Sequence, residues 1–449
     1  MKHPRLHSQI LLLLFFLFAS CEAERNSAPA PKQSAAHEKA LEYFNKAREV
    51  EDTREKIDLF NTALAIIEDR GDTLIPILLE NKIYYHNKLK EYDSSLIFAD
   101  SLIIVSGFQK DTSMLANGYY RKSRIYFYND EQEEVFQNAY EARNLYLKIG
   151  DSSNAGRRTL EMANAQNRMG DFTGEQESAT EAIRYMDVYT DSLYLSEAYN
   201  GIAIVYRNRG FYKDAISEYR NALKYSTTTQ DSLTYLNNLA LVYRDQGNYE
   251  AAIEILNENL EKVDSTSPES RARFLDNLAY VKWKQDPEAE VMEELIKALN
   301  IRLEVNDTEG LLASYSHLSN YFENSDPGRS EFYTELLLQT ARSYGNISAE
   351  LEALEKLVKM SRGEAMKDYS LRYIYLNDSI NSANLKAQNT FAKIKFDEER
   401  KQQEIVSLEA QNALQELEAQ RMRTRTITGA LIGLLILIAL FFLIYYLKQ

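Results

Sequence analysis

Apolar and small residues recur three or four positions apart through the middle of the sequence, as they do on one face of an α-helix. From position 199 onward this face is formed by Tyr199, Ile202, Ala203, Tyr206, Gly210, Tyr212, Ala215, Tyr219 and Ala222. The same order returns 37 residues later as Leu236, Leu239, Ala240, Tyr243, Gly247, Tyr249, Ala252, Leu256 and Asn259. A helical pattern that returns at a fixed period predicts stacked copies of one helical hairpin.

Weaker copies of this pattern flank the central pair. A shift of 40 toward the N-terminus matches Ala163, Gly170, Phe172 and Ala182, and a further shift matches Ser123 and Ala142. A shift of 39 toward the C-terminus matches Leu278, Ala279, Val291 and Ala298, although Lys282 replaces the tyrosine and Asp286-Pro287 replaces the glycine turn. Further hairpins are predicted at 37–69, 74–108, 308–345 and 347–380, which gives about nine in all.

Pairs of Asp with Ser or Thr mark the predicted loop ends. They begin at Asp72, Asp111, Asp151, Asp191, Asp231 and Asp307. A side-chain oxygen at such a position accepts hydrogen bonds from the free N–H groups of the next helix, so we expect these residues to cap helices. They lack the clustered spacing of a calcium loop.

Residues 37–382 resemble the tetratricopeptide repeat family in this order of large, small, aromatic and glycine positions. The resemblance implies an all-α solenoid whose concave groove, lined by the first helix of each hairpin, binds a protein or peptide partner. The groove positions would be Asn164, Asn167, Arg168, Asn200, Arg207, Asn237, Arg244, Tyr280 and Trp283. Asn and Arg there could hold a peptide backbone and acidic side chains. The alternative is that they are solvated helix positions, with Trp283 packed between repeats.

The N-terminus has the three-part layout of a signal peptide over residues 1–20: Lys2 and Arg5, an apolar run, and then Ala19-Ser20. The lone cysteine follows, and Phe18-Ala-Ser-Cys21 resembles a bacterial lipobox, which implies lipidation of Cys21. Cleavage after Ala23 and an uncleaved anchor are the alternatives. Residues 21–36 are expected to form a flexible tether.

The C-terminal residues predict a charged helical stem at 383–425, a transmembrane helix at 426–447 and a two-residue cytoplasmic tail, 448–449. Ile427 to Leu447 carries no charge and would be about 31 Å long as a helix, close to the thickness of a bilayer core. In the stem, nine residues separate Ile405 from Leu414, so a coiled-coil heptad is broken and self-association stays open. Gly429 and Gly433 form a small-xxx-small step at which two copies could dimerise.

The composition and the absence of known motifs from the sequence argue against several classes of function. The chain has 7 Pro and 16 Gly in 449 residues, which favours helix throughout. Its net charge of −15 argues against a nucleic-acid surface. His37, His86 and His317 lack partners at metal-ligand spacing, and no P-loop, dinucleotide fingerprint, HExxH or nucleophile elbow occurs. We therefore expect no enzyme, no catalytic residues, no metal and no cofactor.

Two functions fit these expectations. The first is an exported adaptor or scaffold in a bacterial cell envelope, anchored in the cytoplasmic membrane with its repeats periplasmic. The second is the sensory half of a signalling receptor, because the order of segments is similar to that of repeat-containing histidine kinases and helix-turn-helix regulators of Bacteroidetes-type bacteria. The chain would then lack its cytoplasmic output domain. Arg421, Arg423 and Arg425 lie on the outer side in this topology, against the positive-inside rule, which is weakest behind a translocated domain.

Overall fold

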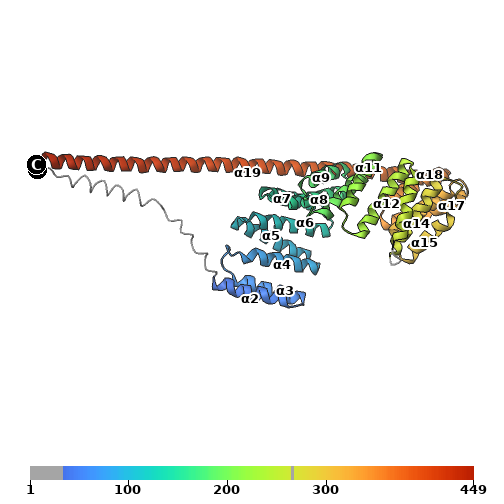
Figure 1. Ribbon diagram of the computed structural model, residues 1–449, viewed down its shortest axis with the longest axis horizontal. Helices are drawn as coiled ribbons and strands as arrows, with labels where there is room; N and C mark the ends of the chain where they lie inside the picture. Colours follow the sequence, from blue (N-terminus) through green and yellow to red (C-terminus); the bar gives the residue numbers. More distant parts are fainter. Residues whose placement is uncertain (1–33, 264–266, 449) are drawn as a thin grey trace. The chain divides into compact units, whose positions relative to one another are not determined.

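The computed structural model describes residues 34–263 and 267–448, and these form eighteen α-helices in consecutive hairpins (Figure 1). The predicted all-α repeat fold is confirmed. Two compact units divide the chain at Lys110, and each is described by itself. The signal peptide, Cys21 and nearly all of the tether lie outside the described residues.

The first unit is built of two helical hairpins. Its helices are α2 (Ala35–Glu49), α3 (Thr53–Ile66), α4 (Leu74–Lys88) and α5 (Tyr92–Gln109). Small Ala40, Ala47 and Ala63 let α2 and α3 approach closely, and Phe60 fills the space between them and Leu78 of α4.

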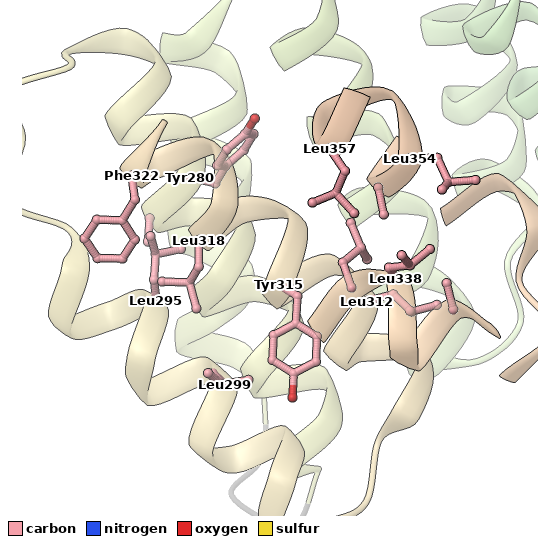
Figure 2. Close-up of a cluster of buried hydrophobic side chains, with 14 of the residues drawn as sticks. Tyr280, Leu295, Leu299, Leu312, Tyr315, Leu318, Phe322, Leu338, Leu354 and Leu357 are labelled. Atoms are coloured by element: carbon pink, nitrogen blue, oxygen red, sulfur yellow. The ribbon is translucent and has the colours of Figure 1, made fainter. Parts of the chain in front are cut away.

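The second unit continues the hairpins and ends in a single long helix. Its helices are α6 (Thr112–Tyr128), α7 (Gln132–Lys148), α8 (Ser152–Met169), α9 (Phe172–Tyr185), α10 (Ser192–Asn208), α11 (Tyr212–Tyr225), α12 (Thr229–Gln246), α13 (Tyr249–Lys262), α14 (Pro268–Gln285), α15 (Met292–Glu304), α16 (Thr308–Phe322), α17 (Pro327–Tyr344), α18 (Ile347–Met360) and α19 (Gly363–Lys448). Its largest core cluster joins α14 to α19 (Figure 2). There Tyr280 lies at the edge, with its hydroxyl directed away from Leu295 and Leu318.

The predicted Asp caps form at some hairpins and not at others. Asp111, Asp151 and Asp307 each accept a hydrogen bond from a backbone N–H of the following helix, at 2.9, 3.0 and 2.9 Å. Asp72 accepts from Leu74 N at 2.9 Å, although Thr73 occupies the cap position.

Two of the predicted caps are wrong. Asp191 stands at the cap position of α10 but makes no capping bond, because its buried carboxylate accepts from Asp187 N, Arg157 and Ser153 instead. Asp231 lies inside the first turn of α12, which Thr228 caps.

The Gly turn of the central repeats requires left-handed backbone. Gly210 and Gly247 have φ of 77° and 84°, a conformation that glycine adopts without steric cost. In earlier hairpins, Lys90 and Asp130 occupy the corresponding turn with φ of 59° and 61°. Where Asp286-Pro287 replaces the glycine, the turn lengthens and α15 begins only at Met292.

Helix α19 is continuous across both predicted boundaries of the stem, at 382/383 and at 425/426. It first packs on α18 through Leu376, and then returns to α7 and α8, where Ala387 and Phe391 are buried. The Phe391 ring lies 4.7 Å from the Phe136 ring, centre to centre. The sequence did not predict this return of the stem onto the repeats.

Helix α19 is the one described helix that is long and apolar enough to cross a membrane, and its most apolar window is wholly exposed. Gly429 and Gly433 lie in this segment, with no other atom within 4 Å of a Cβ built on either.

Candidate functional site

A cavity of about 640 Å³ opens between the first helices of four successive hairpins. Its lining residues include members of α12 (Arg244, Asp245), α14 (Asn277, Tyr280, Lys284), α16 (Glu309, Leu312, Ala313, Ser316, His317, Asn320) and α18 (Ala349, Glu352). The hairpin stacking that buries Leu312 in the core also brings these polar side chains to one side. We call this cavity the α12–α18 pocket.

Two arginines converge on one carboxylate at the α12 end of the pocket. Arg207 Nε and Arg244 Nε donate to the Oδ2 and Oδ1 atoms of Asp245, at 2.8 and 2.9 Å. Arg244 also lies over the Tyr280 ring, 5.7 Å from its centre, and Lys284 lies 5.5 Å from the same centre. Two guanidinium groups and an ammonium against one carboxylate leave this wall with net positive charge.

An amide contact links neighbouring repeats below the pocket. Asn277 Nδ2 donates to Asn237 Oδ1 at 2.7 Å, and Asn237 is buried. Asn277 and His317 lie 40 residues apart, as Leu278 and Leu318 do, so they occupy the same place in two consecutive hairpins. Asn237 lies one position earlier in its own hairpin, because Leu239 corresponds to Leu278 at a shift of 39. The repeat therefore aligns polar groups along the pocket.

His317 is held by stacking and by a buried carboxylate. Its ring lies parallel to the Tyr280 ring, with centres 3.8 Å apart, and its Nδ1 is 3.0 Å from Asp276 Oδ2. Arg302 Nη1 donates to the same oxygen at 2.8 Å. Burial alone would raise the pKa of Asp276, but His317 and Arg302 outweigh it and hold this pKa below its usual value. The carboxylate thus stays charged and fixes both neighbours.

Asn320 is oriented by two neighbours at once. Its Nδ2 donates to the Tyr280 hydroxyl at 3.2 Å, and Lys356 Nζ donates to its Oδ1 at 2.6 Å. Burial raises the pKa of Tyr280 to about 12 and lowers the pKa of Lys356. Across the pocket, Ser316 hydrogen-bonds Glu352. These side chains are fixed in place by the protein itself, which lowers the entropy lost on binding a ligand.

The structure places the nine predicted groove residues in three groups. Arg244 and Tyr280 line the pocket, and Arg207 and Asn237 are each one hydrogen bond away from it. The others lie outside it: Asn164 donates to Glu197, Asn167 to Glu175, and Arg168 to Asp130, while Asn200 accepts from Asn238 and Trp283 packs against Tyr280 and Tyr321.

Sequence reasoning missed Asn277, Ser316, His317, Asn320 and Glu352. The period itself could have found one of them, because Asn320 lies 40 residues after Tyr280 and takes its place in the next hairpin. His317 lacked a signal because its partner, Asp276, is 41 residues away.

The other two described histidines also have carboxylate partners that the sequence did not reveal. His37 Nδ1 lies 2.7 Å from Asp72 Oδ1, and His86 Nδ1 lies 2.7 Å from Glu91 Oε2. Each is a single pair. Within residues 34–263 and 267–448, no three His, Cys, Asp or Glu side chains cluster as metal ligands would.

The pocket presents hydrogen-bonding and cationic groups that are suited to binding. Amides and hydroxyls of Asn277, Ser316 and Asn320 can hydrogen-bond a polypeptide main chain, and Arg244 and Lys284 can bind a carboxylate.

Comparison with known proteins identifies the fold. Residues 194–263 match the tetratricopeptide repeat family, and no curated protein matches the sequence. A signal-transduction ATPase with a tetratricopeptide repeat sensor, from Pyrococcus horikoshii, is similar at 17% identity and a TM-score of 0.50. That match covers 61% of this chain and 43% of the ATPase, so the chain spans less than half of its length. The apo quorum sensor NprR from B. thuringiensis is similar at 13% identity and a TM-score of 0.50, over 74% of this chain and 94% of NprR. Such identities show the fold alone: the chain has the fold of tetratricopeptide-type repeat proteins, and residues 194–263 match the repeat itself.

Proposed function

We propose that the protein is an exported, membrane-anchored adaptor that binds an extended segment of a protein or peptide partner in the α12–α18 pocket and catalyses no reaction. The observation that carries the proposal is the set of fixed polar side chains that four successive hairpins present to one cavity. At about 640 Å³ the cavity lies within the size range of ligand sites. Tetratricopeptide repeats are interaction scaffolds, which agrees with this role.

The charges on one wall of the pocket indicate which group of a partner binds there. Arg244 and Lys284, with Arg207 behind them, outnumber Asp245 at the α12 and α14 wall, whereas Glu309 and Glu352 line the α16 and α18 side. A carboxylate there would make charge-assisted hydrogen bonds, each worth about 1.5–3 kcal/mol. The partner segment should therefore carry Asp, Glu or a C-terminal carboxylate at the position that meets Arg244.

Anchoring in the cytoplasmic membrane, with the repeats periplasmic, is the second part of the proposal. Its support is the length and composition of the last part of α19, together with the signal-like N-terminus and Cys21. Helix α19 would connect the repeats to the membrane without a flexible joint.

A sensory role is a second candidate, and the path of α19 favours it. The helix contacts α18 beside the pocket, then α9, α8 and α7, and then enters the apolar segment. A ligand that changes the stacking of the repeats would act on this helix. Of the similar structures named above, the ATPase is described as having a tetratricopeptide repeat sensor and NprR as a quorum sensor.

Selection of peptides on the full chain tests the binding proposal. Peptides from a displayed random library should bind the parent chain, and Arg244→Glu should weaken them at least tenfold, about 1.4 kcal/mol. Ala313→Trp, which adds bulk to the pocket, should weaken them too. Arg168→Glu is the matched control, since Arg168 is a predicted groove arginine outside the pocket. Equal peptide binding by all three variants would exclude the α12–α18 pocket as the binding site.

Fractionation tests the anchoring independently. The full chain should stay in membranes after carbonate washing. In the Cys21→Ser background, which removes the proposed lipid, replacing Leu435 and Ile436 with Lys should release the chain, because each charge at a bilayer centre costs about 2.5–3.5 kcal/mol. Release of the parent chain by carbonate would contradict a transmembrane helix. Loss of fatty-acid labelling in Cys21→Ser would identify the lipidated cysteine.

A further inference from the structure

Helix α19 carries apolar residues on two opposite faces. The inner face packs on the repeats: Leu376 is buried against α18, and Ala387, Phe391 and Glu398 are buried against α7 and α8. This contact explains the apolar residues of one face. It leaves the other face without a partner within the described chain.

The opposite face carries large apolar residues that are each more than half exposed. They are Leu371, Ile374, Tyr375, Leu385 and Phe396, which we call the outer stripe. Ile374, Leu385 and Phe396 are eleven residues apart, and so are Leu376, Ala387 and Glu398 of the inner face. A step of eleven residues is three helical turns plus about 20°, so the residues of each row stay on nearly the same face. Each inner-face residue follows an outer-stripe residue by two positions, which is a rotation of about 200° around the helix. The outer stripe therefore lies opposite the face that packs on the repeats.

The eleven-residue register leads directly to the small-residue step of the apolar segment. Continued from Ile374 it passes Leu385, Phe396, Ser407, Glu418 and Gly429. Glu418 is the charged position in this row, and Asp378, Lys393 and Arg400 also lie on this side of the helix. Space around Gly429 and Gly433 is open. The heptad that is broken in the stem is thus replaced by an eleven-residue repeat, which favours straight or right-handed pairing.

We propose that the outer stripe binds the outer stripe of a second copy of this chain, in parallel and in register. The pairing rests on the membrane anchoring proposed above, because two α19 helices leaving one membrane run in the same direction and bring identical residues to the same height. Ile374, Leu385 and Phe396 then meet their own copies, and Gly429 lets the apolar segments approach. Confinement to one membrane raises the effective concentration, so a narrow interface suffices.

A lipid surface does not fit the outer stripe. Phe396 precedes Ile427 by 31 residues of continuous helix, or about 46 Å, so the stripe stands well away from the membrane that the apolar segment would enter. The repeats occupy the inner face, which leaves the outer stripe accessible to a second chain.

Disulfide cross-linking of the full chain in membranes tests the pairing. The sequence has one cysteine, so the parent chain gives the background. Leu385→Cys and Phe396→Cys should each form a covalent dimer, at least fivefold above the parent. Ala383→Cys, which is exposed on α19 about 160° around the helix from Leu385, should stay at the parent level.

Co-expression of the two cysteine variants tests the register. Chains with Leu385→Cys and chains with Phe396→Cys should not cross-link to each other, because eleven residues separate the thiols by about 16 Å and a disulfide needs Cβ atoms about 4 Å apart. Efficient mixed dimers would overturn the parallel register. Monomer in both single variants, or equal dimer in Ala383→Cys, would overturn the pairing itself. The membrane fraction is scored separately, so a failure of anchoring is distinguished from a failure to pair.

Discussion

Glu141 of α7 and Glu398 of α19 hydrogen-bond each other, which two carboxyl groups can do only when one of them carries a proton. Burial and the neighbouring Glu398 raise the pKa of Glu141 to about 8. Burial opposes ionisation of Glu398 as well, but Glu141, Lys401 and Gln137 donate to it and lower its pKa. Glu141 is therefore the proton donor, and the return of α19 onto the repeats depends on pH.

The contact between α19 and α7 should weaken as the pH rises. Because the pKa of Glu141 is raised above 4.5, its contribution is complete below pH 4.5 and is lost as the pH rises through about 8. Glu398 acts in the opposite sense, since its lowered pKa makes its contribution fade in acid. Amide hydrogen exchange in residues 384–398, corrected for intrinsic rates, should be faster at about pH 9 than at about pH 6.

Glu141→Gln should remove this difference, because an amide can donate to Glu398 without titrating. Glu399→Gln is the control, since Glu399 lies next to Glu398 in α19 but is exposed. Equal exchange at both pH values in the parent chain would contradict the shared proton.

Phe391 should hold α19 on the repeats. Its ring is buried against Phe136, so Phe391→Ala should cost about 3–5 kcal/mol at this contact. Hydrogen exchange should then rise in both α7 and residues 384–398. Phe396→Ala removes the same side chain from an exposed position five residues later and should leave exchange in α7 unchanged. If both variants behaved alike, the buried ring would not be what fixes the helix.

Lys90 is held in left-handed backbone, and a glycine there should stabilise the first unit. An L-residue in this conformation costs about 1–2 kcal/mol, which glycine avoids. Lys90→Gly should raise the free energy of opening of α4 and α5, measured by hydrogen exchange, by about 1 kcal/mol. Lys88→Gly, inside the last turn of α4, should lower it by a similar amount. A loss of stability in Lys90→Gly would contradict this assignment of strain.

The repeats could be predicted because their pattern is local. The helix face that includes Tyr199 and Ala203 shows a 3.6-residue period, and its return at Leu236 and Ala240 shows the stacking. The contact between Phe391 and Phe136 could not be predicted in this way. It joins segments 255 residues apart, and nothing in the period of either indicates the other.

The pocket could be predicted only in part, because only some of its residues follow from the local repeat pattern. Arg244 and Tyr280 follow from the helix phase, which the repeat fixes. Which hairpins form a cavity depends on local curvature, so Asn164 and Asn200 share the phase and lie elsewhere. The Asp276 pair with His317 depends on the stacking of two hairpins, which residue type alone does not reveal.

Asp276 should be the most sensitive polar residue behind the pocket. It is fully buried, and Arg302, which is almost fully buried too, donates to it at 2.8 Å. Asp276→Asn would remove the nearer counter-charge of Arg302 and leave it only the longer contact with Asp307, at 3.8 Å. Loss of one partner of a buried pair costs about 3–5 kcal/mol. Hydrogen exchange in α14 and α16 should rise, and peptides selected on the parent chain should bind more weakly, because His317 and the Tyr280 ring stacked on it lose their fixed positions. Asp326→Asn breaks an exposed pair with Arg329 and should cost less than about 1 kcal/mol. Similar effects of the two substitutions would mean that the buried carboxylate does not organise the pocket.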